Sequence, residues 1–81
     1  MKSVGEVTHY YGNIGVAIVK LSASLKAGET VRFKGSTTDF AQKVGSMQQD
    51  HTDIEKGKKK DEVGIKVDEK VREGDGVFLE K

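Results

Sequence analysis

The fold is decided by Lys26-Ala27-Gly28-Glu29-Thr30-Val31-Arg32-Phe33, a stretch repeated in pattern as Arg72-Glu73-Gly74-Asp75-Gly76-Val77-Phe78-Leu79. Each copy has a basic residue, a spacer, Gly, an acidic residue, a spacer, Val, a spacer and a large apolar residue. Gly tolerates the left-handed conformation of a tight turn, and the acidic side chain can accept turn amides. A weaker third copy, Lys60-Asp61-Glu62-Val63, lacks the Gly. The pattern predicts tight turns that each lead into a strand.

Strands with one buried face are predicted after these turns. Thr30 to Lys34 alternates, so Val31 and Phe33 are expected to point inward. Glu62 to Asp68 alternates in the same way, and Val77 to Leu79 is predicted to be the last strand. No 3.6-residue apolar period persists, which indicates an all-β chain.

The first part of the chain is predicted to form a hairpin. Val4 to Tyr11 is rich in strand-favouring residues, and Tyr11 to Gly15 has the composition of a turn. Ile14 to Leu21 is apolar on both faces, which is typical of a strand covered on both sides.

The middle of the chain is predicted to hold two more strands. Phe40 to Gln48 is expected to be one strand with a bulge at Gly45, and a short edge strand is expected near Ile54. The bulge would let Val44 and Met47 face the same side.

Length and composition bound the class of protein. The chain has 81 residues, a formal net charge of +1 and no cysteine. We expect a single domain spanning residues 1–81, with neither disulfides nor a thiolate metal site. No apolar run is long enough to span a bilayer, and the first residues do not have the composition of a signal peptide. A cytoplasmic location without a membrane partner is therefore expected.

Taken together and in order, the turn and strand units resemble the second domain of translational GTPases such as elongation factor Tu. The resemblance covers nearly the whole chain and is greatest to short, stand-alone translation elongation factor-like proteins. It extends to the C-terminal barrel of collagenase-like peptidases. The segments that resemble the translational GTPases are Val4-Gly5-Glu6-Val7, Lys26-Ala27-Gly28-Glu29-Thr30-Val31, Asp61-Glu62-Val63-Gly64-Ile65 and Val71-Arg72-Glu73-Gly74-Asp75-Gly76-Val77. Those that resemble the peptidase barrel are Thr37-Thr38-Asp39-Phe40, Ser46-Met47-Gln48 and Val71-Arg72-Glu73-Gly74-Asp75.

The resemblance implies a small, closed, six- or seven-stranded Greek-key-like β-barrel. It also implies a non-catalytic binding module that is associated with RNA (tRNA or rRNA) or a translation component. We expect no GTPase domain, because Gly57-Lys58 lacks the remaining residues of a P-loop. The alternative is a protein-interaction adaptor that acts in trans, like the peptidase barrel, with a peptidase as its partner. DNA is not an expected partner.

Lysines supply the first candidate nucleic-acid site. Lys56, Lys58, Lys59 and Lys60 lie in one charged loop and could contact phosphates, or could form a solvated loop whose field neighbouring acids reduce. A second candidate is a basic patch on neighbouring strands, and the alternative there is ordinary surface charge. That patch would combine Arg32, Lys34 and Lys43 with Lys20.

Aromatic residues supply a third candidate. His9, Tyr10 and Tyr11 adjoin the hairpin turn, and on a strand His9 and Tyr11 share a face. Exposed rings there could stack on bases. Alternatively, one Tyr packs in the core and the other covers the end of the barrel.

Catalysis and metal binding find little support in the sequence. The chain has neither a cysteine nucleophile nor a recognisable serine elbow. Asp50-His51-Thr52-Asp53 contains metal-ligand types, but one short loop seldom supplies a closed site. We expect no catalytic residues, no metal and no cofactor.

Overall fold

The computed structural model describes residues 2–50 and 52–80, which form strands, turns and loops without a helix. No helix that could cross a membrane is therefore present in this part of the chain. The strands are β1 (Lys2–Tyr11), β2 (Val16–Leu21), β3 (Leu25–Lys26), β4 (Thr30–Lys34), β5 (Asp39–Lys43), β6 (Met47–Gln49), β7 (Thr52–Ile54), β8 (Lys56–Gly57), β9 (Glu62–Lys66) and β10 (Gly76–Leu79).

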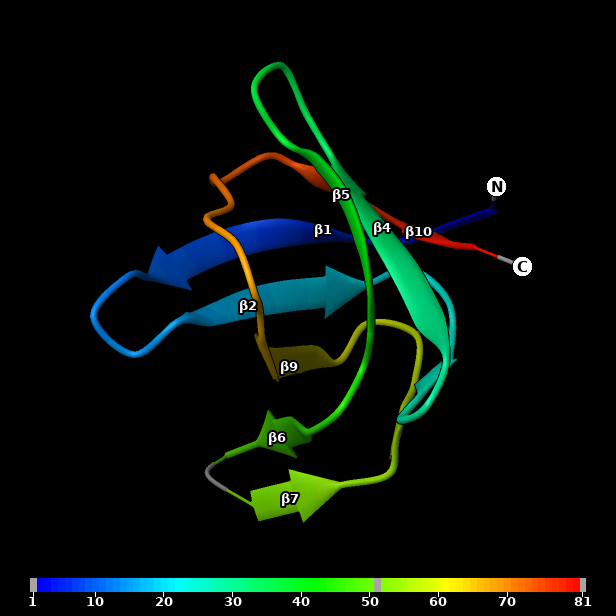
Figure 1. Cartoon of the computed structure of the whole chain (residues 1–81). Coiled ribbons are helices and arrows are strands. Elements are labelled where there is room, and N and C mark those ends of the chain that lie inside the picture. Colours follow the sequence, from blue (N-terminus) through cyan, green and yellow to red (C-terminus); the bar gives the residue numbers. More distant parts are fainter. Residues whose placement is uncertain (1, 51, 81) are drawn as a thin grey trace.

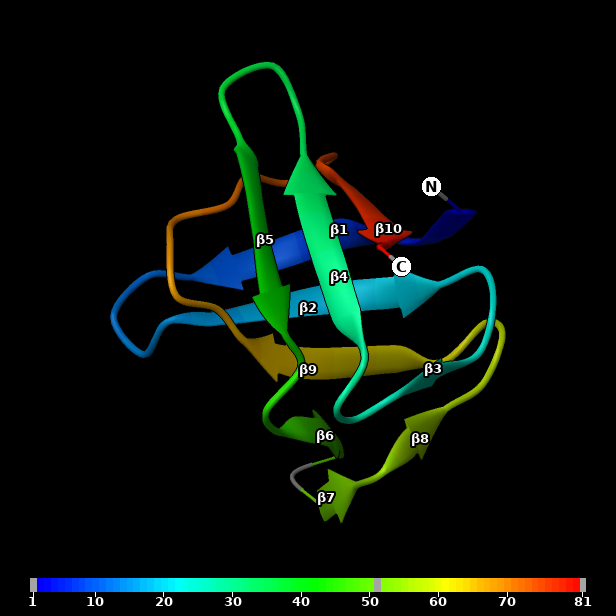
Figure 2. The same ribbon diagram turned by 45° about the vertical axis from the view of Figure 1, so that its right-hand side comes forward.

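Eight of the strands form one sheet in the order β5-β4-β10-β1-β2-β9-β6-β7, and β3 pairs separately with β8. The all-β prediction is confirmed. The prediction of a closed barrel with six or seven strands is wrong, because β5 and β7 are the two ends of an open sheet. The sheet curls so strongly that the β4–β5 hairpin crosses in front of β1 and β2 (Figures 1 and 2).

The side chain of a buried glutamine connects β5, at one end of the open sheet, to the end of β9 and the residues that follow it. Gln42 on β5 is 9% exposed. Its side-chain Nε2 donates to the backbone oxygen of Lys66 at 2.9 Å, and its Oε1 accepts the backbone N–H of Asp68 at 2.8 Å. Side-chain hydrogen bonds thus join β5 to the end of β9 without main-chain pairing between them.

The core fills the space that the curled sheet encloses. The largest fully buried side chains come from several different strands, and Phe33 of β4 also stacks on Phe40 of β5 with ring centroids 5.2 Å apart. The inward positions predicted for β4 and the alternation predicted for β9 are confirmed. The buried core residues are Val4, Val7, Ala17, Val19, Leu21, Leu25, Val31, Phe33, Val44, Met47, Val63, Ile65, Val67, Val71 and Val77.

Strand β1 contains two irregularities in register that were not predicted from the sequence. The register of β1 shifts between Ser3 and Gly5 against β10, and between Val7 and His9 against β2. A bulge adds one residue and so changes which residues face inward. Val7 therefore pairs with Val19, while Tyr10, three residues later, also packs against the core.

The predicted strand from Phe40 to Gln48 is wrong, because the chain bends between β5 and β6. Val44 leaves the ladder and pairs with the turn before β4: its N–H donates to Glu29 O at 2.9 Å, and its oxygen accepts from Gly28 N at 2.8 Å. The bulge expected at Gly45 is replaced by this bend. Val44 and Met47 are nevertheless both buried, and the edge strand near Ile54 is confirmed as β7.

Candidate interaction face

The two faces of β2 have different surroundings. Ala17, Val19 and Leu21 point into the core and are 0–2% exposed. Val16 and Ile18 point to the outer side of the sheet and are only half-buried. The prediction that this strand is covered on both sides is therefore wrong, because among the described residues no strand packs over its outer face. We call this outer side of β1, β2 and β9 the outer face.

An apolar hollow lies on the outer face. Val16 and Ile18 line it together with Tyr11 and Ile14, which are the large apolar residues most exposed in the described chain, at 44% and 59%. The hollow exists because Gly64 of β9 has no side chain. A Cβ atom there would lie 3.4 Å from Val16 Cγ1 and 3.5 Å from Ile18 Cδ1. The rim is polar and carries Gln48, Asp50 and Glu62.

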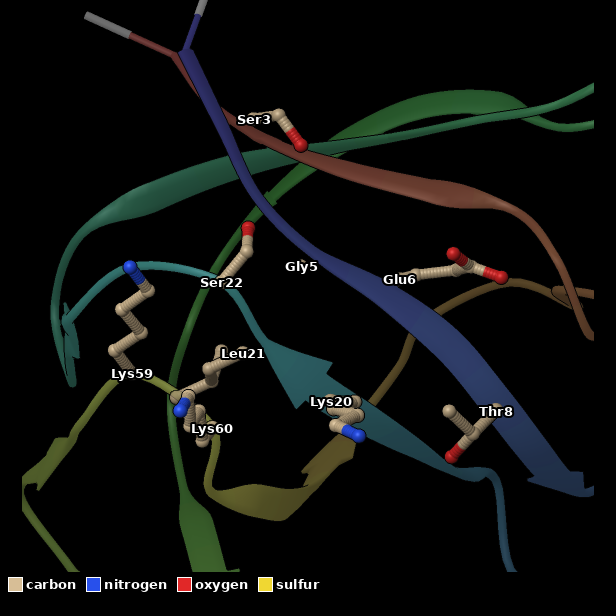
Figure 3. A pocket seen from close by; sticks show the side chains of 9 residues that line it. All are labelled: Ser3, Gly5, Glu6, Thr8, Lys20, Leu21, Ser22, Lys59 and Lys60. Carbon is tan, nitrogen blue, oxygen red and sulfur yellow. The ribbon is translucent and has the colours of Figure 1, made fainter.

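A lysine groove continues the outer face beyond the hollow. Lys20, the next outward residue of β2 after Ile18, lines it with Lys59 and Lys60 from the β8–β9 turn (Figure 3). Backbone hydrogen bonds hold this turn beside β2: Lys60 N–H donates to Leu21 O at 2.7 Å, and Leu21 N–H donates to Asp61 O at 2.8 Å. The remaining lining residues are Ser3, Gly5, Glu6, Thr8, Leu21 and Ser22.

The lysines that the sequence grouped into one loop are distributed over different elements. Lys59 and Lys60 line the groove, whereas Lys56 belongs to β8 and is paired across to Lys26. Lys58 opens the turn, where its backbone N–H donates to Asp61 Oδ2 at 3.0 Å. The candidate loop thus contributes two of its four lysines to a common site.

The second predicted patch is not assembled as expected. Arg32 donates to Glu80 at 2.6 Å and to Asp39 at 2.5 Å. Hydrogen bonding to Glu80 and then to Asp39 raises the pKa of the Arg32 guanidinium above its ordinary value. Lys34 and Lys43 are exposed on β4 and β5, whereas Lys20 lies in the groove with the turn lysines.

The aromatic candidates divide between core and surface. His9 and Tyr11 share a face, as predicted, and their ring centroids are 4.7 Å apart. His9 Nδ1 also lies 3.3 Å from Glu73 Oε2. Tyr10 packs against the core, so only Tyr11 contributes to the apolar hollow.

The described residues contain no group of three or more His, Asp and Glu side chains that could hold a metal ion. His51, which the sequence placed in a disfavoured metal motif, lies outside them. Sequence reasoning missed Gly64 and Ile18 as site residues. The available signal was the apolar run of β2, whose outer side has no covering strand among residues 2–50 and 52–80.

No protein-family model matches the chain. It is 42% identical over 79 residues to an uncharacterized protease from Methanocaldococcus jannaschii. The match covers 96% of this chain and 19% of that protease, so the chain spans about a fifth of the relative's length.

Two crystal structures of the C-terminal domain of a U32 peptidase from Geobacillus thermoleovorans share the fold. One, a selenomethionine variant, superposes with a TM-score of 0.91 at 18% identity and covers 96% of this chain and 99% of that domain. The other gives 0.93 at 19% identity and covers 99% of this chain and 93% of that domain. The chain therefore has the fold of this peptidase domain. The resemblance to the barrel of collagenase-like peptidases is supported, whereas that to translation factors is not.

Proposed function

We propose that the chain is a non-catalytic protein-interaction module that docks onto a peptidase through its outer face. The observation that carries this proposal is the uncovered apolar side of β2. Its residues form a hollow with a polar rim, the usual arrangement of a protein-binding patch. Residues of this kind on the inner side of the same strand are fully buried.

The choice of a peptidase as partner rests on the Methanocaldococcus jannaschii protease. The segment that matches this chain is 19% of that protein, so most of the protease lies outside it. We call that remainder the peptidase body. In such a protease, the peptidase body would cover the outer face of the module. When the module acts in trans, the corresponding surface of a partner peptidase would cover the outer face.

The proposal that the module is non-catalytic is supported by its interior. Aliphatic and aromatic side chains fill the space within the curled sheet, and the two hollows lie on its outside. The module would therefore supply binding, and the peptidase body would supply the chemistry.

The sequence-based hypothesis of an RNA- or translation-associated module stays a prediction. Its candidate residues lie in separate places, and the carboxylates of Asp50 and Glu62 on the hollow's rim would repel a phosphate backbone.

The proposal is tested by calorimetric titration of the chain into the Methanocaldococcus jannaschii protease lacking its matching segment. Circular dichroism first establishes that this peptidase body is folded, and the excised segment serves as the positive control. Binding that persists at high salt supports an apolar interface, because phosphate contacts weaken steeply with salt. Binding of the excised segment without binding of this chain would contradict the proposal.

A further inference from the structure

Two other turns among the described residues have the same hydrogen-bonding pattern as the turn that carries Lys60. In each four-residue turn, the last N–H donates to the first C=O, at 3.2, 3.0 and 3.1 Å. The last carboxylate in turn accepts the first N–H, at 2.7, 3.0 and 2.9 Å. In this order the turns are Lys26–Glu29, Lys58–Asp61 and Arg72–Asp75. The weak third copy seen in the sequence is thus a complete turn.

Lys60 occupies the position that glycine holds in both other turns. The φ angles of the third residue are +94° at Gly28, +78° at Lys60 and +92° at Gly74. A Cβ at Gly28 or Gly74 would have no atom within 4 Å, so glycine is favoured there by its backbone freedom and not by lack of space. A lysine at the same φ is strained, and strained residues cluster at functional sites.

The strained turn places Lys60 with two other cations in the lysine groove. Lys59 lines the groove with Ser22, and the carboxylate of Glu6 points away from Lys59 (Figure 3). The ion pairs among residues 2–50 and 52–80 involve His9 and Arg32, so no lysine of the groove has a carboxylate within 4 Å in this part of the chain. The groove therefore presents three cationic groups to an incoming anion.

The position of the groove indicates what kind of anion it meets. Ile18 and Lys20 are successive outward residues of β2, so their side chains leave the strand about 7 Å apart. A polypeptide segment lying in the apolar hollow would reach the lysines within a few residues. The acidic rim at Asp50 and Glu62 disfavours a continuous polyanion such as RNA.

We infer that the lysine groove binds the carboxylates of a short acidic protein segment whose apolar neighbours fill the hollow. This inference rests on the proposed function and names the chemistry of the partner: an apolar anchor followed by Asp or Glu side chains. The strain at Lys60 is tolerated because the side chain there is used for binding.

The test is an NMR amide titration of the labelled chain with a six-residue polyglutamate peptide at low salt. We expect shifts at Lys20, Ser22, Lys59 and Lys60. The double variant Lys20→Gln/Lys59→Gln should bind the peptide about threefold to tenfold more weakly, as expected for two exposed charge pairs. The control Lys26→Gln/Lys70→Gln removes the same charge from exposed sites outside the groove and should bind as the parent does. Equal weakening by both variants would overturn the site.

The variant Lys60→Gly distinguishes a role of Lys60 in peptide binding from a role in stabilising the fold. Glycine relieves the strain, so the variant should melt about 4 °C higher while binding the peptide more weakly. If Lys60 had only a structural role, Lys60→Gly would leave the Tm unchanged or lower it, or would leave peptide binding unchanged. Titration with tRNA provides the competing outcome: shifts at the groove with tRNA and none with polyglutamate would overturn the inference in favour of nucleic acid.

A last measurement distinguishes the inference from the proposed function. Gly64→Val fills the hollow without changing charge. If it abolishes binding to the peptidase body while Lys20→Gln/Lys59→Gln does not weaken it, the inference fails and the proposed function stands. If polyglutamate binds the groove and the peptidase body does not bind the chain, the proposed function fails and the carboxylate site remains.

Discussion

The inner and outer faces of β2 carry similar apolar residues but differ in their exposure to solvent. Inward, Ala17, Val19 and Leu21 are buried in the core, on the side of β2 that the β4–β5 hairpin crosses (Figure 2), and outward, Val16 and Ile18 remain half-exposed beside the gap left by Gly64. Burial here depends on which distant strands cross the sheet, because both sides of the strand carry apolar residues and only the third outward residue, Lys20, is polar. An apolar face without a cover is a candidate for an interface.

The largest difference between the two faces should appear on truncation. Leu21→Ala removes a 2%-exposed core side chain and should lower the free energy of unfolding by about 3 kcal/mol. Ile18→Ala, on the same strand, should cost less than about 1 kcal/mol because Ile18 is already partly solvated. Urea denaturation followed by circular dichroism measures both. Similar losses for the two variants would mean that the outer face is part of the core.

The glutamine link between β5 and β9 holds the hairpin over the inner face. Gln42→Ala leaves Lys66 O and Asp68 N–H without their partner and should cost about 2 kcal/mol. Gln42→Glu keeps an acceptor for Asp68 but at neutral pH has no proton for Lys66. Its stability should rise relative to the parent as pH falls, since the protonated carboxyl donates again. A pH-independent difference between Gln42→Glu and the parent would exclude this role for the donor.

Two glycines, one facing the core and one facing the outer hollow, allow a closely matched comparison of stability. A Cβ at Gly57 would lie 2.4 Å from Leu21 Cδ1, so Gly57→Ala should overpack the core and cost about 1–3 kcal/mol. A Cβ at Gly64 would lie 3.4 Å from its nearest neighbour, Val16 Cγ1. Gly64→Ala should therefore change the free energy of unfolding by less than about 0.5 kcal/mol. Thermal melts of the two variants compare them directly. A large loss at Gly64 would show that the hollow has no room for a partner's side chain.

Local signals in the sequence predicted much of the fold. The repeated turns, the alternation of β4 and β9 and the last strand are set by residues that are neighbours in the chain. The bulges of β1, the bend at Val44 and the link through Gln42 depend on contacts between distant segments. The barrel was therefore expected to be closed, although the sheet is open and a side chain bridges one of its ends.

The candidate site was harder to predict, for the same reason. Lys59 and Lys60 were recognised as a charge cluster, but their union with Lys20 needs the hydrogen bonds between the turn and Leu21. The hollow needs Gly64 of β9 to lie opposite Ile18 of β2, where both Val16 and Ile18 would border its side chain. His9 and Tyr11 were correctly placed on one face, since strand alternation is a local property.

The most direct test of the outer face is the affinity of the chain for the peptidase body, measured for the parent, Gly64→Val and Ile18→Asn. The account predicts binding by the parent, and about thirtyfold weaker binding by each variant at unchanged fold, as expected for a central interface anchor. Parent-like affinity in both variants would contradict the assignment of this face.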